Sequence, residues 1–312
     1  MSSLLIIGGT GFFGKSILDC YKRGLLSSWG IDKVIVMSRN PDNFKQNYSE
    51  LISQGVEFFD GDISKVDFLP ESDYVIHAAA STDASRYLSH SEKEKRNIIN
   101  GTLNYCRLAP EFHRDSKIVF CSSGAVYGYQ QESVKCLTED MLFGNIEKLD
   151  EVKKSYAYAK RDSELAIEEL GQAELNVSIA RCFAFVGKYL PRDQHFAIGN
   201  FIADGLAGRA INVKATKKVY RSYLHADDLV KWLMTLADNA NPQCPIYNVG
   251  SDKEVEVKDL AYMIAEIFDV DVLCARVTTR EVDRYIPSIQ KTKKILGLNP
   301  NSNLKQLISL SI

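Results

Sequence analysis

The fold of this chain is decided by the stretch Gly8-Gly9-Thr10-Gly11-Phe12-Phe13-Gly14. The apolar run Leu4-Leu5-Ile6-Ile7 precedes it, and a helical pattern through Ile17, Leu18 and Tyr21 follows it. Glycines let a backbone turn tightly from strand to helix and approach a pyrophosphate, whose charge meets the free N–H groups of the helix N-terminus. We therefore expect a dinucleotide-binding fold and not merely a structural turn. The residues expected to contact the cofactor here are Gly8, Thr10, Gly11, Phe12, Phe13 and Gly14.

Short β-rich runs recur along the first half of the chain, with helical stretches between most of them. These runs are Leu4–Ile7, Val34–Met37, Val56–Phe59, Tyr74–His77, Lys117–Phe120 and Val177–Ala180. Alternating β and α units predict an α/β protein with a Rossmann-type, doubly wound parallel sheet. After about Arg181 the alternation loosens, and helical patterns follow at Val257–Phe268 and Gln290–Leu296. This change indicates a smaller C-terminal substrate-binding lobe.

Composition excludes several classes of partner. The 312 residues include 38 basic and 40 acidic side chains, so the net charge of -2 provides no basic face for nucleic acid. No apolar run reaches the ~20 residues that span a bilayer, and no cationic leader precedes the first strand, so we expect a cytoplasmic protein without a membrane partner. The seven cysteines form no C-x-x-C pair and the five histidines have no metal-ligand spacing. We therefore expect neither disulfides nor a metal site.

A second informative stretch is Ser155-Tyr156-Ala157-Tyr158-Ala159-Lys160, at the head of a helical pattern. Tyr156 and Lys160 are four residues apart and share one helix face. A nearby ammonium lowers the pKa of a tyrosine, which helps it to exchange protons near neutral pH. The strand ending at Ser123 places a hydroxyl at the carboxyl edge of the sheet, where ligands bind in open α/β sheets. We therefore expect Ser123, Tyr156 and Lys160 to form the catalytic group, although Ser123 alone could be an ordinary polar strand end.

Together these segments resemble the extended short-chain dehydrogenase/reductases that act on nucleotide-activated sugars, among them epimerases, dehydratases and 4-keto reductases. The likeness covers nearly the whole chain, and it extends to Asp60–Ile63, Val75–Ala79, Ser122–Gly128 and Arg221–Asp228. It implies an NAD(P)-binding Rossmann domain formed by residues 1–180 and about 219–246. Residues 181–218 and 247–312 would then form a nucleotide-sugar-binding lobe. The resemblance also implies a homodimer, built through a four-helix bundle that includes the helix of Tyr156.

By the same resemblance, several residues line the cofactor. Asp62 and Ile63 would flank the adenine, and Lys160 would also hold the nicotinamide ribose. The small residues Ala78, Ala79 and Ala80 would line the cofactor, although helix packing against the sheet would explain them equally well. Considered alone, Asp62 fits equally well as a loop acid that caps a turn.

The resemblance also indicates where a nucleotide sugar would bind. Ser123 and Gly124 would lie at the sugar, and Arg221 would bind the diphosphate, because a guanidinium matches phosphate oxygens bidentately. The family's usual asparagine is replaced by Ala184, and Asn200 is the candidate to substitute for it. Arg284, next to Tyr285, is expected to close the same pocket. The alternative for Arg221 is a solvated surface arginine.

The choice of cofactor depends on the residues after the second strand. An NAD enzyme usually offers an acid to the ribose hydroxyls, but this chain has Ser38 and Arg39. An arginine attracts a 2′-phosphate that an acid would repel, so we expect NADP(H), with NAD(H) as the alternative. Arg39 could instead point to water or stack on the adenine.

The reaction class follows from what stands beside Ser123. The family's 4,6-dehydratases carry an Asp-Glu pair there, whereas this chain has Gly124 and Ala125, so dehydration is not expected. The remaining chemistry is hydride transfer at C4 of the sugar. The sequence from Arg181 to Asn200 and from Arg221 to Asp228 resembles that of bacterial enzymes that reduce dTDP-4-keto-6-deoxyhexoses for polysaccharide building. We therefore expect an NADPH-dependent 4-keto reductase of the cytoplasm. A 4-epimerase is the first alternative, and a non-catalytic NADP-binding sensor is the alternative of another class.

Overall fold

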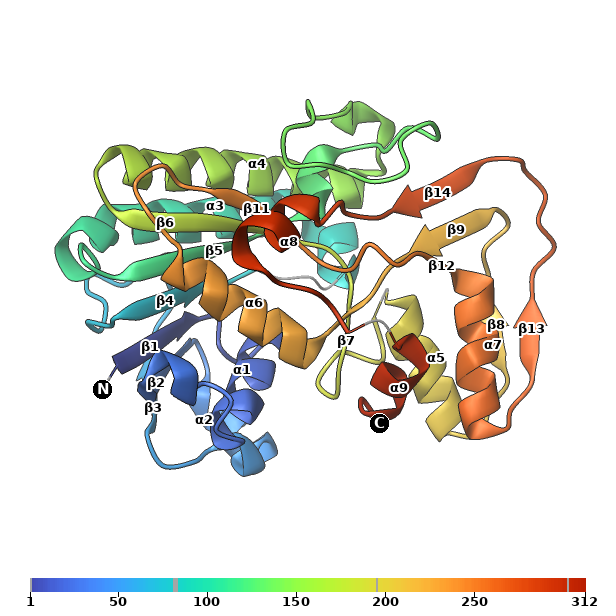
Figure 1. Cartoon of the computed structure of the whole chain (residues 1–312), viewed down its shortest axis with the longest axis horizontal. Coiled ribbons are helices and arrows are strands. Elements are labelled where there is room, and N and C mark those ends of the chain that lie inside the picture. The colour runs from blue at the N-terminus through green and yellow to red at the C-terminus, as the bar shows by residue number, and fades with distance from the viewer. Residues whose placement is uncertain (1, 81–83, 195, 302) are drawn as a thin grey trace.

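The computed structural model describes residues 2–80, 84–194, 196–301 and 303–312, with the side chains of residues 84–88 outside that description. A seven-stranded parallel sheet with the order β11-β6-β5-β4-β1-β2-β3 forms its centre (Figure 1). Its strands are β1 (Ser2–Ile7), β2 (Ile31–Ser38), β3 (Val56–Asp60), β4 (Tyr74–His77), β5 (Lys117–Ser123), β6 (Asn176–Cys182) and β11 (Ile246–Val249). Each strand expected from the sequence is present, and the predicted doubly wound α/β fold is confirmed.

The strands are apolar on both faces because helices cover both faces of the sheet. In β1, Leu4 and Ile6 belong to one buried cluster, while Leu5 and Ile7 belong to the cluster on the opposite face. The helices on the first face are α1 (Phe12–Lys22), α2 (Pro41–Asn47) and α6 (Ala226–Asp238). The helices on the second face are α3 (Ala84–Phe112), which is interrupted at His90, and α4 (Glu151–Gln172). All carboxyl ends of the parallel strands consequently meet at one edge.

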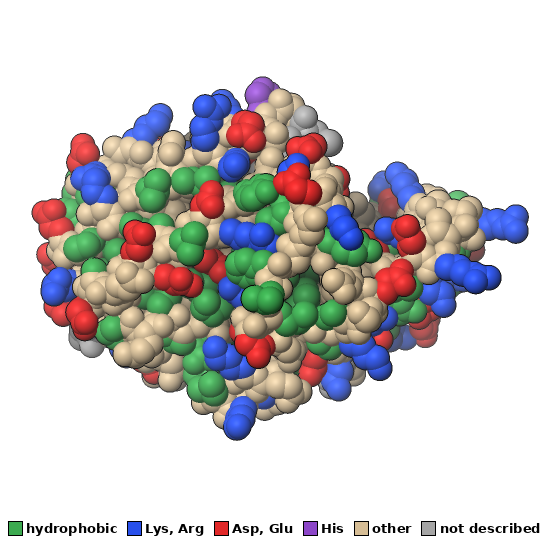
Figure 2. Space-filling view, turned by 90° about the horizontal axis from the view of Figure 1, so that it is seen from above, with side chains coloured by type: hydrophobic (Ala, Val, Ile, Leu, Met, Phe, Trp, Pro, Cys, Tyr) green, Lys and Arg blue, Asp and Glu red, His purple; other side chains and the backbone are tan. Residues whose placement is uncertain are grey.

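The remaining elements build a second, smaller part with its own apolar core, which contains Phe201, Leu260 and Ile264. Figure 2 shows this part projecting from the main body, with a hollow between the two and Lys and Arg side chains at its end. Its helices are α5 (Ala197–Leu206), α7 (Val257–Phe268) and α9 (Leu304–Ser309). Its strands and those near it are β7 (Phe185–Val186), β8 (Ile211–Val213), β9 (Lys218–Arg221), β10 (Leu224–His225), β12 (Val255–Glu256), β13 (Val272–Cys274) and β14 (Val282–Tyr285).

Each of the two parts is built from several separate stretches of the chain. β11 is the outer strand of the central sheet, which therefore extends to residue 249, past the expected boundary near 246. α8 (Gln290–Leu296) returns to this strand, where Lys291 Nζ donates to the carbonyl of Ile246 (2.8 Å). β9 pairs with β14 so that Arg221 lies opposite Tyr285. These crossings bring the end of β14 back to the edge of the central sheet.

Candidate functional site

The loop between β1 and α1 is shaped by its glycines. Gly8 has a φ of +84°, and a Cβ there would lie 2.7 Å from the Cα of Ala79. Gly14 lies against Gly9, whose carbonyl oxygen would be 1.9 Å from an added Cβ. Gly11 precedes α1 without any side chain capping the helix, and a Cβ on it would meet nothing nearer than 3.6 Å. Neither a capping side chain nor a Cβ on Gly11 therefore occupies the N-terminus of α1, which fits the pyrophosphate of a dinucleotide.

The rings of the two phenylalanines in this loop pack against another aromatic ring of the protein. Phe12 and Phe13 pack against Phe185, with ring centroids 6.2 and 5.3 Å apart, respectively. Any contact that these residues make with a phosphate would therefore use their backbone N–H groups and not their side chains.

The end of β2 lies beside the glycine loop. Gly8 and Gly9 both donate to the carbonyl of Met37 (3.2 Å each), and the hydroxyls of Thr10 and Ser38 are 3.3 Å apart. Arg39 is exposed and lies close enough to Asp62 to affect its ionisation. Burial disfavours the charge of Asp62, but hydrogen bonds from Ser64 and the charge of Arg39 hold its pKa below the usual value. Two residues expected at the adenosine end of the cofactor, Arg39 and Asp62, are thus neighbours.

Asp62 also performs the local role that the sequence left open. Its carboxylate accepts hydrogen bonds from the N–H (3.0 Å) and the hydroxyl (2.8 Å) of Ser64, so it caps the turn after β3. Ile63 is buried, and its carbonyl accepts from Asn104 (2.7 Å). The adenine contact predicted for these residues stays a prediction.

Small residues connect the glycine loop with the tyrosine. Ala78 continues β4 by donating its N–H to the carbonyl of Ile7 (2.9 Å), and Ala79 lies against Gly8. Ala80 packs in a small apolar cluster with Ile98 and Tyr156. Ile98 is buried, whereas the neighbouring Asn97 and Asn100 are both exposed. The side of Tyr156 that faces this cluster is therefore apolar.

Ser123, Tyr156 and Lys160 lie together at the carboxyl edge of the sheet. Asp150 caps α4 by accepting from the N–H of Lys153 (2.9 Å), which sets the start of the helix that carries Tyr156. Ser123, at the end of β5, lies near the hydroxyl of Tyr156. Lys160 is 2% exposed, its Nζ donates to the carbonyl of Cys121 (2.7 Å), and it lies 5.9 Å from the centre of the Tyr156 ring.

The expectation that Lys160 lowers the pKa of Tyr156 is wrong for this structure. Burial raises the pKa of Tyr156, and the nearby hydroxyl of Ser123 only partly opposes that effect. Burial also lowers the pKa of Lys160 to about 8. Tyr156 is thus a phenol that holds its proton at neutral pH, and it is suited to donate that proton to a developing alkoxide.

A buried polar network lies behind these residues. Glu164 of α4 accepts from the Ser122 hydroxyl and from the Arg181 guanidinium, whose shortest contact is 2.7 Å, and both charged side chains are 4% exposed. Arg181 also donates to the hydroxyl of Tyr127 (3.2 Å), which in turn donates to Asn248 of β11 (2.8 Å). The network fastens β5, α4, β6 and β11 to one another and so fixes the strand end that carries Ser123.

A third hydroxyl approaches Ser123 from the smaller part. Tyr285, at the end of β14, also lies near Ser123. A Cβ on Gly124 would lie 2.5 Å from its hydroxyl and 2.7 Å from the ring of Phe183. The sequence indicates that Tyr285 lies near the pocket, but its approach to Ser123 depends on how β14 returns to the sheet.

The polar side chains expected at the diphosphate are engaged with other groups of the protein. Arg221 pairs with Asp283 (2.9 Å), and Arg284 pairs with Glu254 and stacks over the ring of Tyr220. Asn200 donates to the carbonyl of Gln194 (2.7 Å). The sequence shows no pattern that indicates these acids as partners, because Asp283 and Glu254 are 62 and 30 residues from their arginines.

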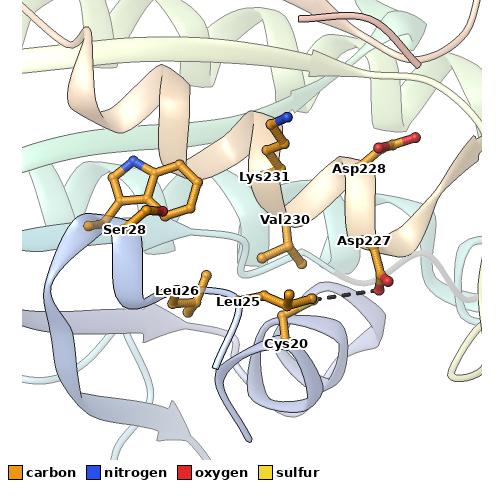
Figure 3. A pocket seen from close by; sticks show the side chains of 9 residues that line it. Cys20, Leu25, Leu26, Ser28, Asp227, Asp228, Val230 and Lys231 are labelled. Carbon is orange, nitrogen blue, oxygen red and sulfur yellow. Dashed lines mark hydrogen bonds between the residues drawn. The ribbon is translucent and has the colours of Figure 1, made fainter. Parts of the chain in front are cut away.

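A separate cavity lies away from these residues. Its volume is about 280 Å³, and it opens between α1, the segment before β2, and α6 (Figure 3). Cys20 faces Asp227 across it, with 3.6 Å between Sγ and the carboxylate. Its lining includes no residue expected at the cofactor or the sugar. Among the described residues, no cluster of His, Cys, Asp or Glu could hold a metal, and no helix is long and apolar enough to cross a membrane.

Known proteins resemble this chain in sequence and in fold. UDP-glucuronic acid decarboxylase 6 of Arabidopsis thaliana is 28% identical over 311 residues, which cover 98% of this chain and 87% of that protein. A UDP-glucose 4-epimerase of Thermotoga maritima superimposes with a TM-score of 0.80 at 20% identity, over 99% of this chain and 97% of that one. A dTDP-glucose 4,6-dehydratase of Streptomyces venezuelae with NAD bound gives 0.81 at 22% identity, over 99% and 95%.

These solved structures share the fold, and the identities by themselves support nothing finer. The sequence profile of one family, however, matches residues 4–250, from the first strand to the last strand of the central sheet. The match includes the glycine loop, Ser123, Tyr156 and Lys160. This chain belongs to the NAD dependent epimerase/dehydratase family.

Proposed function

We propose that this protein is an NADPH-dependent reductase that acts at C4 of a nucleotide-activated 4-keto-6-deoxyhexose, with a dTDP sugar as the first candidate. The observation that carries the proposal is the place of the half-buried Tyr156, on the same helix as the buried Lys160 and near Ser123 at the carboxyl edge of the sheet, where burial keeps the proton on its phenol by raising its pKa. A protonated phenol is the form that a reductase needs, because the carbonyl oxygen must gain a proton as its carbon gains a hydride.

In this proposal each residue has a separate task. The nicotinamide, when bound, supplies the hydride. Tyr156 donates its proton to the carbonyl oxygen, and Ser123 helps to hold the nearby Tyr156 hydroxyl in place. Lys160, fixed by its bond to the carbonyl of Cys121, holds the nicotinamide ribose.

The space beside Ser123 supports reduction over dehydration. Gly124 and Ala125 carry no acid, and the room above Gly124 is taken by the hydroxyl of Tyr285 and the ring of Phe183. An acidic side chain at position 124 would therefore collide with both. Loss of water across a sugar C–C bond needs an acid and a base, and these two positions offer neither.

The choice of NADPH rests on Arg39. Its exposed guanidinium follows β2, beside the expected ribose position, and suits a 2′-phosphate. We expect Arg39→Ala to weaken NADPH binding about tenfold and to leave NADH binding nearly unchanged, because only NADPH carries the extra phosphate. Titration of each cofactor against both proteins measures this, and equal losses for the two cofactors would contradict it.

The decisive experiment mixes the purified protein with NADPH and a dTDP-4-keto-6-deoxyhexose and follows the loss of reduced-nicotinamide absorbance. NADH and the Tyr156→Phe variant are run alongside. We expect oxidation that is faster with NADPH and that falls by about 10²-fold or more without the Tyr156 hydroxyl. Oxidation that persists in Tyr156→Phe would contradict the proposed role of this residue.

The second candidate is a 4-epimerase, because the same three residues can first oxidise C4 and then reduce it. An epimerase would retain its cofactor, release it only on denaturation, and interconvert saturated nucleotide sugars without external NADPH. The similarity to UDP-glucuronic acid decarboxylases adds UDP-glucuronic acid to the substrate panel. Release of CO₂ from that compound would replace the reductase proposal.

We also propose a homodimer that forms through α3 and α4. Leu103 of α3 and Leu165 of α4 are 52% and 62% exposed, on helices that pack closely together. Burying such side chains in an interface is favourable. We expect light scattering to give twice the chain mass and Leu165→Glu to give the monomer.

A further inference from the structure

Asn248 of β11 is fully buried, and every polar atom of its side chain is bonded within the protein. Its Nδ2 donates to two main-chain carbonyls, those of Leu137 (2.8 Å) and Ser288 (3.0 Å). Its Oδ1 accepts from the hydroxyl of Tyr127 (2.8 Å). An amide NH₂ group has two protons to donate, and here both are used. Asn248 therefore joins the edge of the central sheet to two segments that lie far from it in the sequence.

The two segments that Asn248 holds are also bonded to each other. The N–H of Leu137 donates to the carbonyl of Ile286 (2.9 Å), and the N–H of Ser288 donates to the carbonyl of Leu137 (2.7 Å). Leu137 lies in the loop before α4 and is 4% exposed, whereas Ser288 comes shortly after the last residue of β14. The amide of Asn248 thus fastens the chain just beyond β14 to the central sheet.

These bonds decide where the end of β14 lies. Among the described strands, β14 pairs with β9 alone, so its own sheet holds it on one side. Tyr285, its last residue, packs its ring against Phe183 with 4.7 Å between the centroids. A Cβ on Gly124, next to Ser123, would lie 2.5 Å from the Tyr285 hydroxyl. The bonds from Asn248 to the chain after Tyr285 are therefore an anchor that keeps this hydroxyl at the edge where the sugar is expected.

We propose that Asn248 is a positioning residue for substrate binding, because it fixes Tyr285 beside Ser123 and with it the space that receives the sugar. The inference rests on the proposed binding of a nucleotide sugar at this edge. Asn248 touches no ligand itself, since its amide is saturated by protein groups. It acts through the main chain that leads back to Tyr285. The hydride step depends on Tyr156 and the nicotinamide, so we expect sugar affinity to change more than kcat.

The test is Asn248→Leu, which nearly keeps the size of the side chain and removes both donors. The carbonyls of Leu137 and Ser288 then lose a partner, so the chain after β14 can shift. With NADPH saturating, we expect KM for the nucleotide sugar to rise about tenfold and kcat to stay within about threefold of the wild type. The Kd for NADPH should not change, because none of these bonds involves the glycine loop. A lower melting temperature with an unchanged KM would overturn the proposal, since Asn248 would then be structural only.

Tyr127→Phe is the matched control. It removes a buried hydroxyl that bonds to the same amide, but it leaves both bonds of Asn248 Nδ2 in place. We expect this variant to lower the melting temperature and to leave KM within about twofold of the wild type. A rise in KM equal to that of Asn248→Leu would contradict the role of the two donors.

Asn248→Ser covers the case in which Asn248→Leu does not fold. A serine hydroxyl can still donate one hydrogen bond, so KM should rise by a smaller factor, about threefold, with kcat unchanged. A folded Asn248→Ser protein with the KM of the wild type would also overturn the proposal.

Hydrogen exchange followed by mass spectrometry separates this inference from the proposed reduction, because it needs no turnover. Asn248→Leu or Asn248→Ser should speed exchange at Leu137 and Ser288, whose N–H bonds the amide supports. Residues 8–14 should exchange as in the wild type. Unchanged exchange at Leu137 and Ser288 would overturn the positioning role. If the wild type oxidises no NADPH, the reduction fails by itself, and calorimetric affinity for the nucleotide sugars of the panel takes the place of KM.

Discussion

The cluster at the end of β5 and the arginines of β9 and β14 are built in opposite ways. Ser123 and Lys160 are buried at the edge of the sheet, Tyr156 is half-buried beside them, and the Lys160 ammonium bonds to a main-chain carbonyl. Arg221 and Arg284 are each paired with a carboxylate, and all four of these charged side chains are partly exposed.

This difference suits the cluster at the end of β5 to the chemical step and the two arginines to binding of the substrate. The buried cluster is complete once the chain has folded, so its dipoles need little rearrangement during a reaction. The arginines already have anionic partners, so a phosphate that binds them must displace or share a carboxylate. We therefore expect substitutions behind the cluster to change stability, and substitutions at the arginines to change affinity.

We expect the largest effect, a loss in the free energy of unfolding, from substitution of Glu164 in the buried network behind the cluster. Glu164→Gln removes the charge opposite Arg181, and both side chains are 4% exposed. Leaving one buried charge unpaired costs about 3–5 kcal/mol. Denaturant unfolding of the two proteins measures the loss.

Glu254→Gln is the matched control, because it breaks the ion pair of Arg284 on the partly exposed side. We expect it to cost about 1 kcal/mol or less, since that carboxylate is 48% exposed. Equal losses in the two variants would remove the distinction between the two regions.

The next effect is a pH dependence from Lys160. Burial lowers its pKa from 10.5 to about 8, so between these values the unfolded chain binds more protons than the folded one. Stability contributed by this residue should therefore rise with pH across that window, by about 3 kcal/mol in total, as the cost of the buried charge disappears.

Lys160→Met isolates this contribution, because methionine has a similar length and no charge. The difference in unfolding free energy between variant and wild type should shrink as pH rises from about 8 to 10.5. A difference that does not change with pH would mean that Lys160 is not buried as a cation.

The smallest effect is expected at the arginines. Arg221→Ala should weaken nucleotide-sugar binding about tenfold, because a charge-assisted bond to phosphate is lost. Asp283→Asn should strengthen binding a few-fold, since the competing carboxylate is gone. Calorimetric titration with the NADPH-loaded protein measures both. If Asp283→Asn also weakens binding, then Asp283 orients Arg221 for the phosphate and does not compete with it.

The sequence could predict those features that depend on neighbouring residues. The glycine loop follows β1 directly, and Tyr156 and Lys160 lie one helical turn apart on α4, so local periodicity is enough to relate them. The approach of Tyr285 to Ser123 could not be predicted in this way, because the two residues are 162 positions apart in the chain and β14 must first return to the sheet. The pairing of Arg221 with Asp283 depends on the register of β9 and β14.

The sequence by itself determined the doubly wound fold, the glycine loop and the helix with the Tyr/Lys pair, because apolar periodicity and glycine spacing act over short stretches of chain. Only the tertiary structure decided the electrostatics of the site. Burial keeps the proton on Tyr156, and the crossing of β14 places a third hydroxyl near Ser123 and a carboxylate on Arg221. Desolvation and charge pairing depend on what surrounds a group in space, and a residue's position in the chain does not specify those surroundings.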